Sequence, residues 1–172
     1  MLIKKATEQD YEAFAELNLE VQKLHFQAEP TVFKPASAYS KEEYGKLLSD
    51  PGLGLFLGFQ ENHAPEENHT SEANRAVGYI FCEIWHSKET PLLHALSGVY
   101  IRHVAVQRDL RSKGIGTKLL AAVRKFADEH EISRIELDTW AFNTDANAFF
   151  KRNGFKPAKE RLSLTLKPKS SL

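Results

Sequence analysis

Several features that would place a chain outside the ordinary globular classes are missing here. The 172 residues include a single cysteine, Cys82, so no internal disulfide can form and a disulfide-stapled secreted fold is excluded. No apolar run approaches the roughly 20 residues that a membrane helix needs. Residues 1–6 also have no long apolar stretch behind their lysines, as a signal peptide would have. We therefore expect a cytoplasmic protein with no membrane partner.

The chain also has a net charge of zero, because 23 basic residues balance 23 acidic ones. The balance hides an asymmetry: residues 1–75 hold 7 basic and 13 acidic residues, and the remainder carries a net charge of +6. A basic half suits an anionic ligand. No zinc-finger spacing or basic-region helix is present, so we expect no nucleic-acid partner. His63 and His69 stand in the polar, acidic segment 61–74, which is typical of a solvated loop, so we expect no metal.

One core is the default at this length, and residues 1–172 are expected to form a single domain. Ser40-Lys41-Glu42-Glu43 has the pattern of a capping box and predicts the start of a short helix. The other elements follow from apolar periodicity. We predict strands at 1–6, 53–59, 76–85, 95–106, 134–140 and 155–166, and further helices at 7–25, 113–130 and 144–153. Strands and helices alternate in the second half, which favours an α/β protein with a mixed sheet covered by helices.

The most informative stretch runs from Val104-Ala105-Val106 through a short basic turn with two glycines, Gly114 and Gly116, into an amphipathic helix. Unpaired amides at a helix start, together with the helix dipole, favour an anion. The four-residue spacing of the nucleotide P-loop is absent. The dinucleotide fingerprint needs a small residue where this chain has Leu119, so both nucleotide interpretations are weakened.

What fits is Arg-x-x-Gly-x-Gly, here Arg111 to Gly116, after a strand that ends in Val-Ala-Val. This closely resembles the coenzyme A pyrophosphate motif of the GCN5-related N-acetyltransferases, the GNAT superfamily. A second match lies at 143–155, with Asn143, an Ala three residues on, the pair Phe149-Phe150 and a closing Gly-Phe. The 26 residues between Gly116 and Asn143 suit the helix and strand that the family places there.

The resemblance implies an acyl-CoA N-acyltransferase fold: a mixed, mostly antiparallel sheet of about six to seven strands flanked by helices. This sheet is expected to splay between the strands at 99–106 and 134–140, leaving backbone groups free to pair with the arm of acetyl-CoA. On that analogy the strand end lines the arm, the glycine turn holds the pyrophosphate, and two residues of the second motif also touch the cofactor. The expected cofactor-binding residues are Val104, Ala105, Val106, Arg111, Ser112, Lys113, Gly114, Ile115, Gly116, Thr117, Asn143 and Phe150. Asn143 is equally suited to cap the last helix.

Catalysis in this family is attack of a neutral amine on the acetyl thioester, which needs a route for the amine's proton. Where the family often has a tyrosine as thiolate acid, this chain has Phe150, which cannot donate a proton. Asp138 is the first candidate for the base. Tyr100 is a second catalytic candidate, as base or as replacement acid, and shares a strand face with Arg102 by two-residue alternation. His103 is expected to face away from both.

The sequence leaves open which other side chains act in catalysis or substrate recognition and which amine is the acceptor. Glu83 is a further candidate base on a neighbouring strand, and Arg102, which is no base at neutral pH, is a candidate for recognising a substrate carboxylate. Residues 21–44 are expected to set the identity of the amine. We expect transfer of an acetyl group from acetyl-CoA to a primary amine of a small molecule. The alternatives are a protein N-terminal or lysine acetyltransferase and a non-catalytic acyl-CoA-binding module, and the resemblance leaves a homodimer open.

Overall fold

The computed structural model describes residues 1–35, 37–60 and 75–164. They fall into two compact units, residues 1–138 and the chain from Thr139 onward. The acidic segment 61–74, predicted to be a loop, lies outside the described residues. No helix in the described part of the chain is both long and apolar enough to span a membrane.

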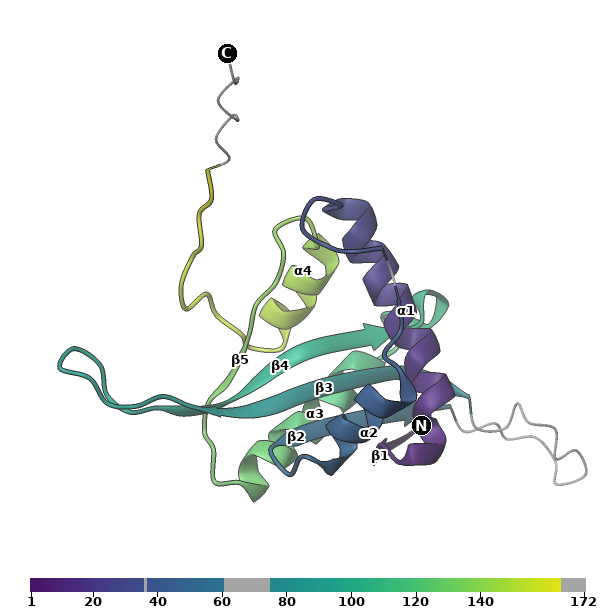
Figure 1. Ribbon diagram of the computed structural model, residues 1–172, viewed down its shortest axis with the longest axis horizontal. Coiled ribbons are helices and arrows are strands. Elements are labelled where there is room, and N and C mark those ends of the chain that lie inside the picture. Colours follow the sequence, from purple (N-terminus) through teal and green to yellow (C-terminus); the bar gives the residue numbers. More distant parts are fainter. Residues whose placement is uncertain (36, 61–74, 165–172) are drawn as a thin grey trace, which may run out of the picture. The chain divides into compact units, whose positions relative to one another are not determined.

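The first unit contains five strands and three α-helices (Figure 1). In chain order these are β1 (Leu2–Lys5), α1 (Tyr11–Ala28), α2 (Lys41–Ser49), β2 (Leu53–Phe59), β3 (Ala76–His86), β4 (Ser97–Val106), α3 (Ile115–Glu129) and β5 (Ile135–Leu137). Single 3-10 turns, Glu8–Asp10 and Arg108–Leu110, precede α1 and α3. The predicted capping box is confirmed: the Ser40 hydroxyl accepts a hydrogen bond from the Glu43 amide, and the Glu43 carboxylate accepts one from the Ser40 amide.

The five strands form one sheet in the order β1-β2-β3-β4-β5. The first three pairings are antiparallel, and β5 lies parallel to β4, so the sheet is mixed, as predicted. β3 and β4 form its longest pairing and continue beyond the other strands as a hairpin (Figure 1). The parallel pairing is short and joins only residues 99–101 to 135–137.

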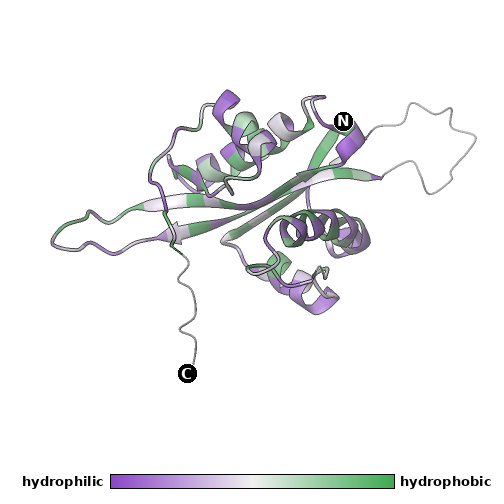
Figure 2. Ribbon diagram, turned by 90° about the horizontal axis from the view of Figure 1, so that it is seen from above, coloured by the Kyte–Doolittle hydropathy of each residue, from purple (hydrophilic) through white to green (hydrophobic). Residues whose placement is uncertain are grey.

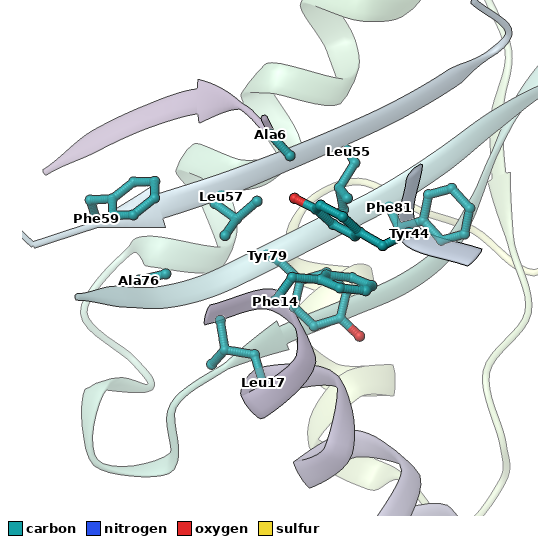
Figure 3. Packing of buried hydrophobic residues seen from close by; sticks show 10 residues of the cluster. All are labelled: Ala6, Phe14, Leu17, Tyr44, Leu55, Leu57, Phe59, Ala76, Tyr79 and Phe81. Carbon is teal, nitrogen blue, oxygen red and sulfur yellow. The ribbon is translucent and has the colours of Figure 1, made fainter. Parts of the chain in front are cut away.

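Helices cover both faces of this sheet (Figure 2). On one face Phe14 of α1 and Tyr44 of α2 pack together over Leu55, Leu57 and the inward side chains of β3. Figure 3 shows this cluster, which is completed by Ala6, Leu17, Phe59, Ala76, Tyr79 and Phe81. On the opposite face Phe126 of α3 meets Phe56, which alternation along β2 turns away from the first cluster.

In the second unit α4 (Thr144–Arg152) is closed at both ends by the residues of the second motif. The Asn143 side chain accepts a hydrogen bond from the Ala146 amide, so this residue is the N-cap. At the other end Gly154 has φ of 93°, and the Phe155 amide donates to the Phe150 carbonyl at 3.1 Å. The Phe150 and Phe155 rings pack edge to face. This combination is a Schellman cap, in which the closing Gly-Phe ends the helix.

The predicted strand at 155–166 is wrong over the residues that the structure describes, because 155–164 form no strand. The described sheet therefore has five strands rather than six to seven. Leu162 and Leu164 alternate as strand residues do, but both side chains are 84% exposed. Alternation alone makes no strand without a partner edge to pair with. The strand predicted at 134–140 is shorter, because its pairing with β4 stops at Leu137.

Candidate active site

The two-glycine turn leads from β4 into α3 with an open backbone. Gly114, the residue before the helix, has φ of 79°, in the left-handed region that favours glycine. A Cβ built there would meet no atom within 4 Å. The amides of Ile115, Gly116 and Thr117 lie in the first turn of the helix, so they have no acceptor within it. Amide donors beside open space, at the positive end of a helix, are suited to bind an anion such as a pyrophosphate.

Positive side chains surround this turn. Arg108, Arg111 and Lys113 are exposed. The Arg111 guanidinium Nε donates to the Val106 carbonyl at 3.2 Å, which ties the turn to the end of β4. The Ile115 side chain is buried, so only its backbone is available to a ligand. Residues 111–114 therefore form a turn with two basic side chains, Arg111 and Lys113, and residues 115–117 form the first turn of α3.

The sheet opens beside this turn, as predicted. β4 continues to Val106, whereas its pairing with β5 ends where Ile101 meets Leu137. Val104, Ala105 and Val106 remain paired with β3 on their other side. Beyond Ile101 the edge of β4 that faces β5 has no strand partner among the described residues, which is the edge that the arm of acetyl-CoA is predicted to use.

A β-bulge at Arg102 changes which face its neighbours occupy. Ile101 pairs with Cys82 and His103 pairs with Phe81, so Arg102 has no opposite residue on β3. Phe81 and Glu83 share one face of β3, and Glu83 pairs with Tyr100. His103 therefore lies on the same face as Tyr100. The prediction that His103 faces away from Tyr100 is wrong, because the extra residue reverses the alternation.

On this face the strands form a hollow of about 420 Å³ lined by Glu83, Trp85, Tyr100, Arg102 and Glu136. Tyr100 lies between Glu83 on β3 and Glu136 on β5 in one cross-strand row. The Arg102 guanidinium contacts the Glu83 carboxylate at 2.6 Å. Trp85 lies flat over Gly98, where a Cβ would come within 2.5 Å of the indole nitrogen. The volume is in the range of small-molecule sites.

Tyr100 and Asp138, the two predicted catalytic residues, are neighbours in the first unit. Burial raises the pKa of the Tyr100 hydroxyl, and the charge and hydrogen bonding of the Asp138 carboxylate raise it further. Tyr100 therefore stays protonated, which makes it a poor proton donor for a leaving thiolate. Asp138 itself is exposed and follows directly after β5. This arrangement can hold a carboxylate at the edge of the hollow.

Behind the bulge the partly buried His103 meets two buried polar side chains. Its Nδ1 lies 3.4 Å from the Nδ2 of Asn18 on α1, and the same Nδ2 donates to the Tyr79 hydroxyl at 3.0 Å. Burial lowers the pKa of His103 to about 4, and the charges of His25 and Arg102 add to the shift. His103 is consequently neutral at pH 7, and its Nδ1 faces the Asn18 side chain of α1.

The remaining two predicted residues, Asn143 and Phe150, lie in the second unit. Asn143 caps α4, which is the structural role considered for it from the sequence. Phe150 is buried and packs against Phe149 and Phe155. Asn147, which no sequence pattern singled out, links this segment: it accepts a hydrogen bond from Thr139 and donates to the Trp140 and Asn143 carbonyls.

Trp85 and Glu136 line the hollow but were not predicted from the sequence. Two-residue alternation would have found them, because Trp85 follows Glu83 and Glu136 precedes Asp138 at that spacing. Among the described residues no three His, Cys, Asp or Glu side chains gather as a metal-binding group.

The profile of the acetyltransferase (GNAT) family matches residues 18–155, which span the glycine turn, the hollow and the second motif. The chain belongs to this family. The match supports the resemblance that the two motifs carry. No match is found among curated protein sequences.

Solved structures confirm the GNAT fold. A substituted form of the BH1408 protein from Bacillus halodurans is 23% identical, with a TM-score of 0.86 over 97% of this chain and 100% of that one. The aminoglycoside antibiotic 6'-N-acetyltransferase AAC(6')-IG from Acinetobacter haemolyticus is 15% identical, with a TM-score of 0.67 over 98% and 100%. AAC(6')-Iy, solved with a bisubstrate analogue that contains CoA, is 16% identical, with a TM-score of 0.69 over 97% and 98%.

Proposed function

We propose that this GNAT protein transfers the acetyl group of acetyl-CoA directly to a primary amine of a small molecule. The observation that carries the proposal is the open glycine turn at the start of α3, beside the unpaired edge of β4. The turn offers amide donors and positive charge, and the β4 edge offers backbone groups, which together suit the pyrophosphate and the amide-rich arm of the cofactor. AAC(6')-Iy is a structural neighbour that was solved with a CoA-containing analogue.

The residues of the chain have separable tasks in this mechanism. The amides from Ser112 to Thr117 hold the pyrophosphate, and the backbone of residues 104–106 aligns the arm. Acetyl-CoA, when bound, supplies the activated thioester. The hollow places the amine beside Asp138, whose carboxylate accepts the amine's proton, directly or through one water. The Tyr100 hydroxyl lies beside that carboxylate and, because it stays protonated, can donate a hydrogen bond that orients it. No acid is assigned to the departing thiolate, because Phe150 carries no proton to donate.

A small acceptor fits the hollow and its walls. About 420 Å³ accommodates a compact molecule, and Trp85 gives it one apolar side. The aminoglycoside acetyltransferases among the structural neighbours act on small amines, as their names state. A peptide amine is the alternative acceptor. The cytoplasmic location stays a prediction of the sequence.

The first experiment is calorimetric titration of the purified protein with acetyl-CoA, with ATP and NAD as controls. We expect binding of acetyl-CoA alone. A screen of small amines and of peptides by thiol release then identifies the acceptor class. Activity confined to peptides would replace the small-amine proposal. Binding without thiol release from any acceptor would indicate a non-catalytic acyl-CoA-binding module, and absence of binding would refute the proposed function.

A further inference from the structure

A polar cluster made of the buried Asn18 and Tyr79 and the partly buried His103 has no part in the mechanism above. Asn18 is fully buried, on the helix face that otherwise packs apolar side chains such as Phe14 and Leu17 against the sheet. Tyr79 lies beside Phe14 in this core (Figure 3). The Asn18 amide donates to Tyr79 and meets His103, and so connects α1 to both β3 and β4.

This cluster contributes less to the stability of the fold than apolar side chains of similar volume would. The Asn18 Oδ1 is buried and has no hydrogen-bond partner among the described residues. An unmet buried acceptor costs free energy, and a set of apolar side chains of similar volume is often as stable or more so. Buried polar contacts of this kind are best known for fixing one register among several.

The register that this cluster can fix is the pairing of β4 with β3. Without the bulge, Arg102 rather than His103 would pair with Phe81, and every residue from His103 to Val106 would exchange faces. In the observed register the imidazole Nδ1 meets the Asn18 amide. In the alternative register the Arg102 guanidinium would be driven into the apolar cluster. The contact between Asn18 and His103 is therefore satisfied only when β4 is bulged.

The bulge comes directly after Ile101, the last β4 residue that pairs with β5, and directly before residues 104–106. We propose that Asn18 and His103 are positioning residues: their contact holds β4 in its bulged register, so that the backbone of residues 104–106 is presented to acetyl-CoA. This inference rests on the proposed function. It assigns these side chains no contact with substrate or cofactor.

The decisive variant replaces the whole cluster by apolar residues: Asn18→Leu with Tyr79→Phe and His103→Leu. Because no polar group is left behind in the core, this triple variant is expected to fold with an unfolding temperature close to that of the wild type. Two effects are expected nevertheless. Acetyl-CoA affinity falls at least tenfold, and the cross-strand amide contact between positions 81 and 103, measured by NMR, weakens or shifts by one residue.

Two further variants separate positioning from general stability. His103→Asn keeps an acceptor for the Asn18 amide and is expected to hold acetyl-CoA affinity within threefold of the wild type. Leu17→Ala lies next to Asn18 and removes only packing. It is expected to lower the unfolding temperature by roughly 5–15 °C while leaving the affinity unchanged at temperatures where it is folded.

The proposal is overturned if the triple variant keeps the pairing of position 81 with position 103, or if it binds acetyl-CoA as tightly as the wild type. Failure of the proposed function is distinguishable, because then the wild type itself binds no acetyl-CoA. The NMR contact still decides the register in that case.

Discussion

Substitution of Gly114 separates the fold of the turn from its proposed ligand. Any other residue at φ of 79° costs roughly 1–2 kcal/mol of the free energy of unfolding. No atom lies within 4 Å of the added Cβ, so no steric clash adds to that cost. For a chain of this size each kcal/mol corresponds to about 2–4 °C in unfolding temperature. Gly114→Ala and Gly114→Glu should therefore both fold, with unfolding temperatures lowered by roughly 2–8 °C.

The two variants should differ sharply in acetyl-CoA binding. Glutamate brings a negative charge to the place proposed for the pyrophosphate. Two like charges 4 Å apart repel by about 4 kcal/mol at an effective dielectric constant near 20. We expect Gly114→Glu to weaken acetyl-CoA binding by at least about 100-fold, and Gly114→Ala by no more than about tenfold. Calorimetric titration measures both.

Gly154 provides a matched control, because it too has positive φ, 93°, and open space around the added Cβ. Gly154→Glu introduces the same charge and similar backbone strain at the end of α4. Its acetyl-CoA affinity should stay within about threefold of the wild type. If Gly114→Glu is folded and also binds within threefold of the wild type, the pyrophosphate has been placed wrongly.

Three more predictions concern the hollow and the bulge. Asp138→Asn should lower kcat by about 10²–10⁴-fold and leave acetyl-CoA affinity unchanged, and an unaltered kcat in thiol-release assays would remove Asp138 as the base. Gly98→Ala should displace the Trp85 indole and raise the KM for the amine several-fold, with no change in the KM for acetyl-CoA, because the new Cβ falls 2.5 Å from the ring nitrogen. Since the pKa of His103 is about 4 in the fold against 6.5 ordinarily, the unfolded chain binds the proton first. The contribution of His103 to the free energy of unfolding should be constant above pH 6.5 and fall by about 3 kcal/mol as the pH drops to 4; an equally steep fall in His103→Asn would contradict this.

Much of the fold could be predicted from local patterns that act independently of the rest of the chain. The strand at 53–59 is observed with the predicted bounds, and the capping box at Ser40 forms as expected. The glycine turn was predictable because a positive φ before a helix costs conformational free energy for any residue with a Cβ, whereas glycine adopts it without that penalty. These features are decided by a few neighbouring residues.

The errors involve pairing between distant residues. Tyr100 and Arg102 alternate in the sequence whether or not a bulge follows them, so the orientation of His103 depended on a bulge in the pairing with β3 that no local pattern contains. The strand predicted from Leu162 and Leu164 likewise needed a neighbour for its edge, and the described residues form no strand there. Glu136 was missed although two-residue alternation from Asp138 pointed to it, and its place beside Tyr100 comes from the pairing of β5 with the neighbouring β4.

The ion pairs around the hollow also bear on the acceptor proposed for it. Glu83 is neutralised by Arg102 and Glu136 by Arg134, whereas Asp138 takes part in no ion pair among the described residues. Asp138, an exposed residue beside Tyr100 at the edge of the hollow, is thus a carboxylate whose charge no neighbour neutralises among these residues. If the amine binds in the hollow as proposed, we expect the site to favour a cationic acceptor over a neutral or anionic one. Because mobile ions screen exposed charges over about 8–10 Å at moderate ionic strength, its preference should weaken as salt rises, whereas selection by shape at Trp85 should persist.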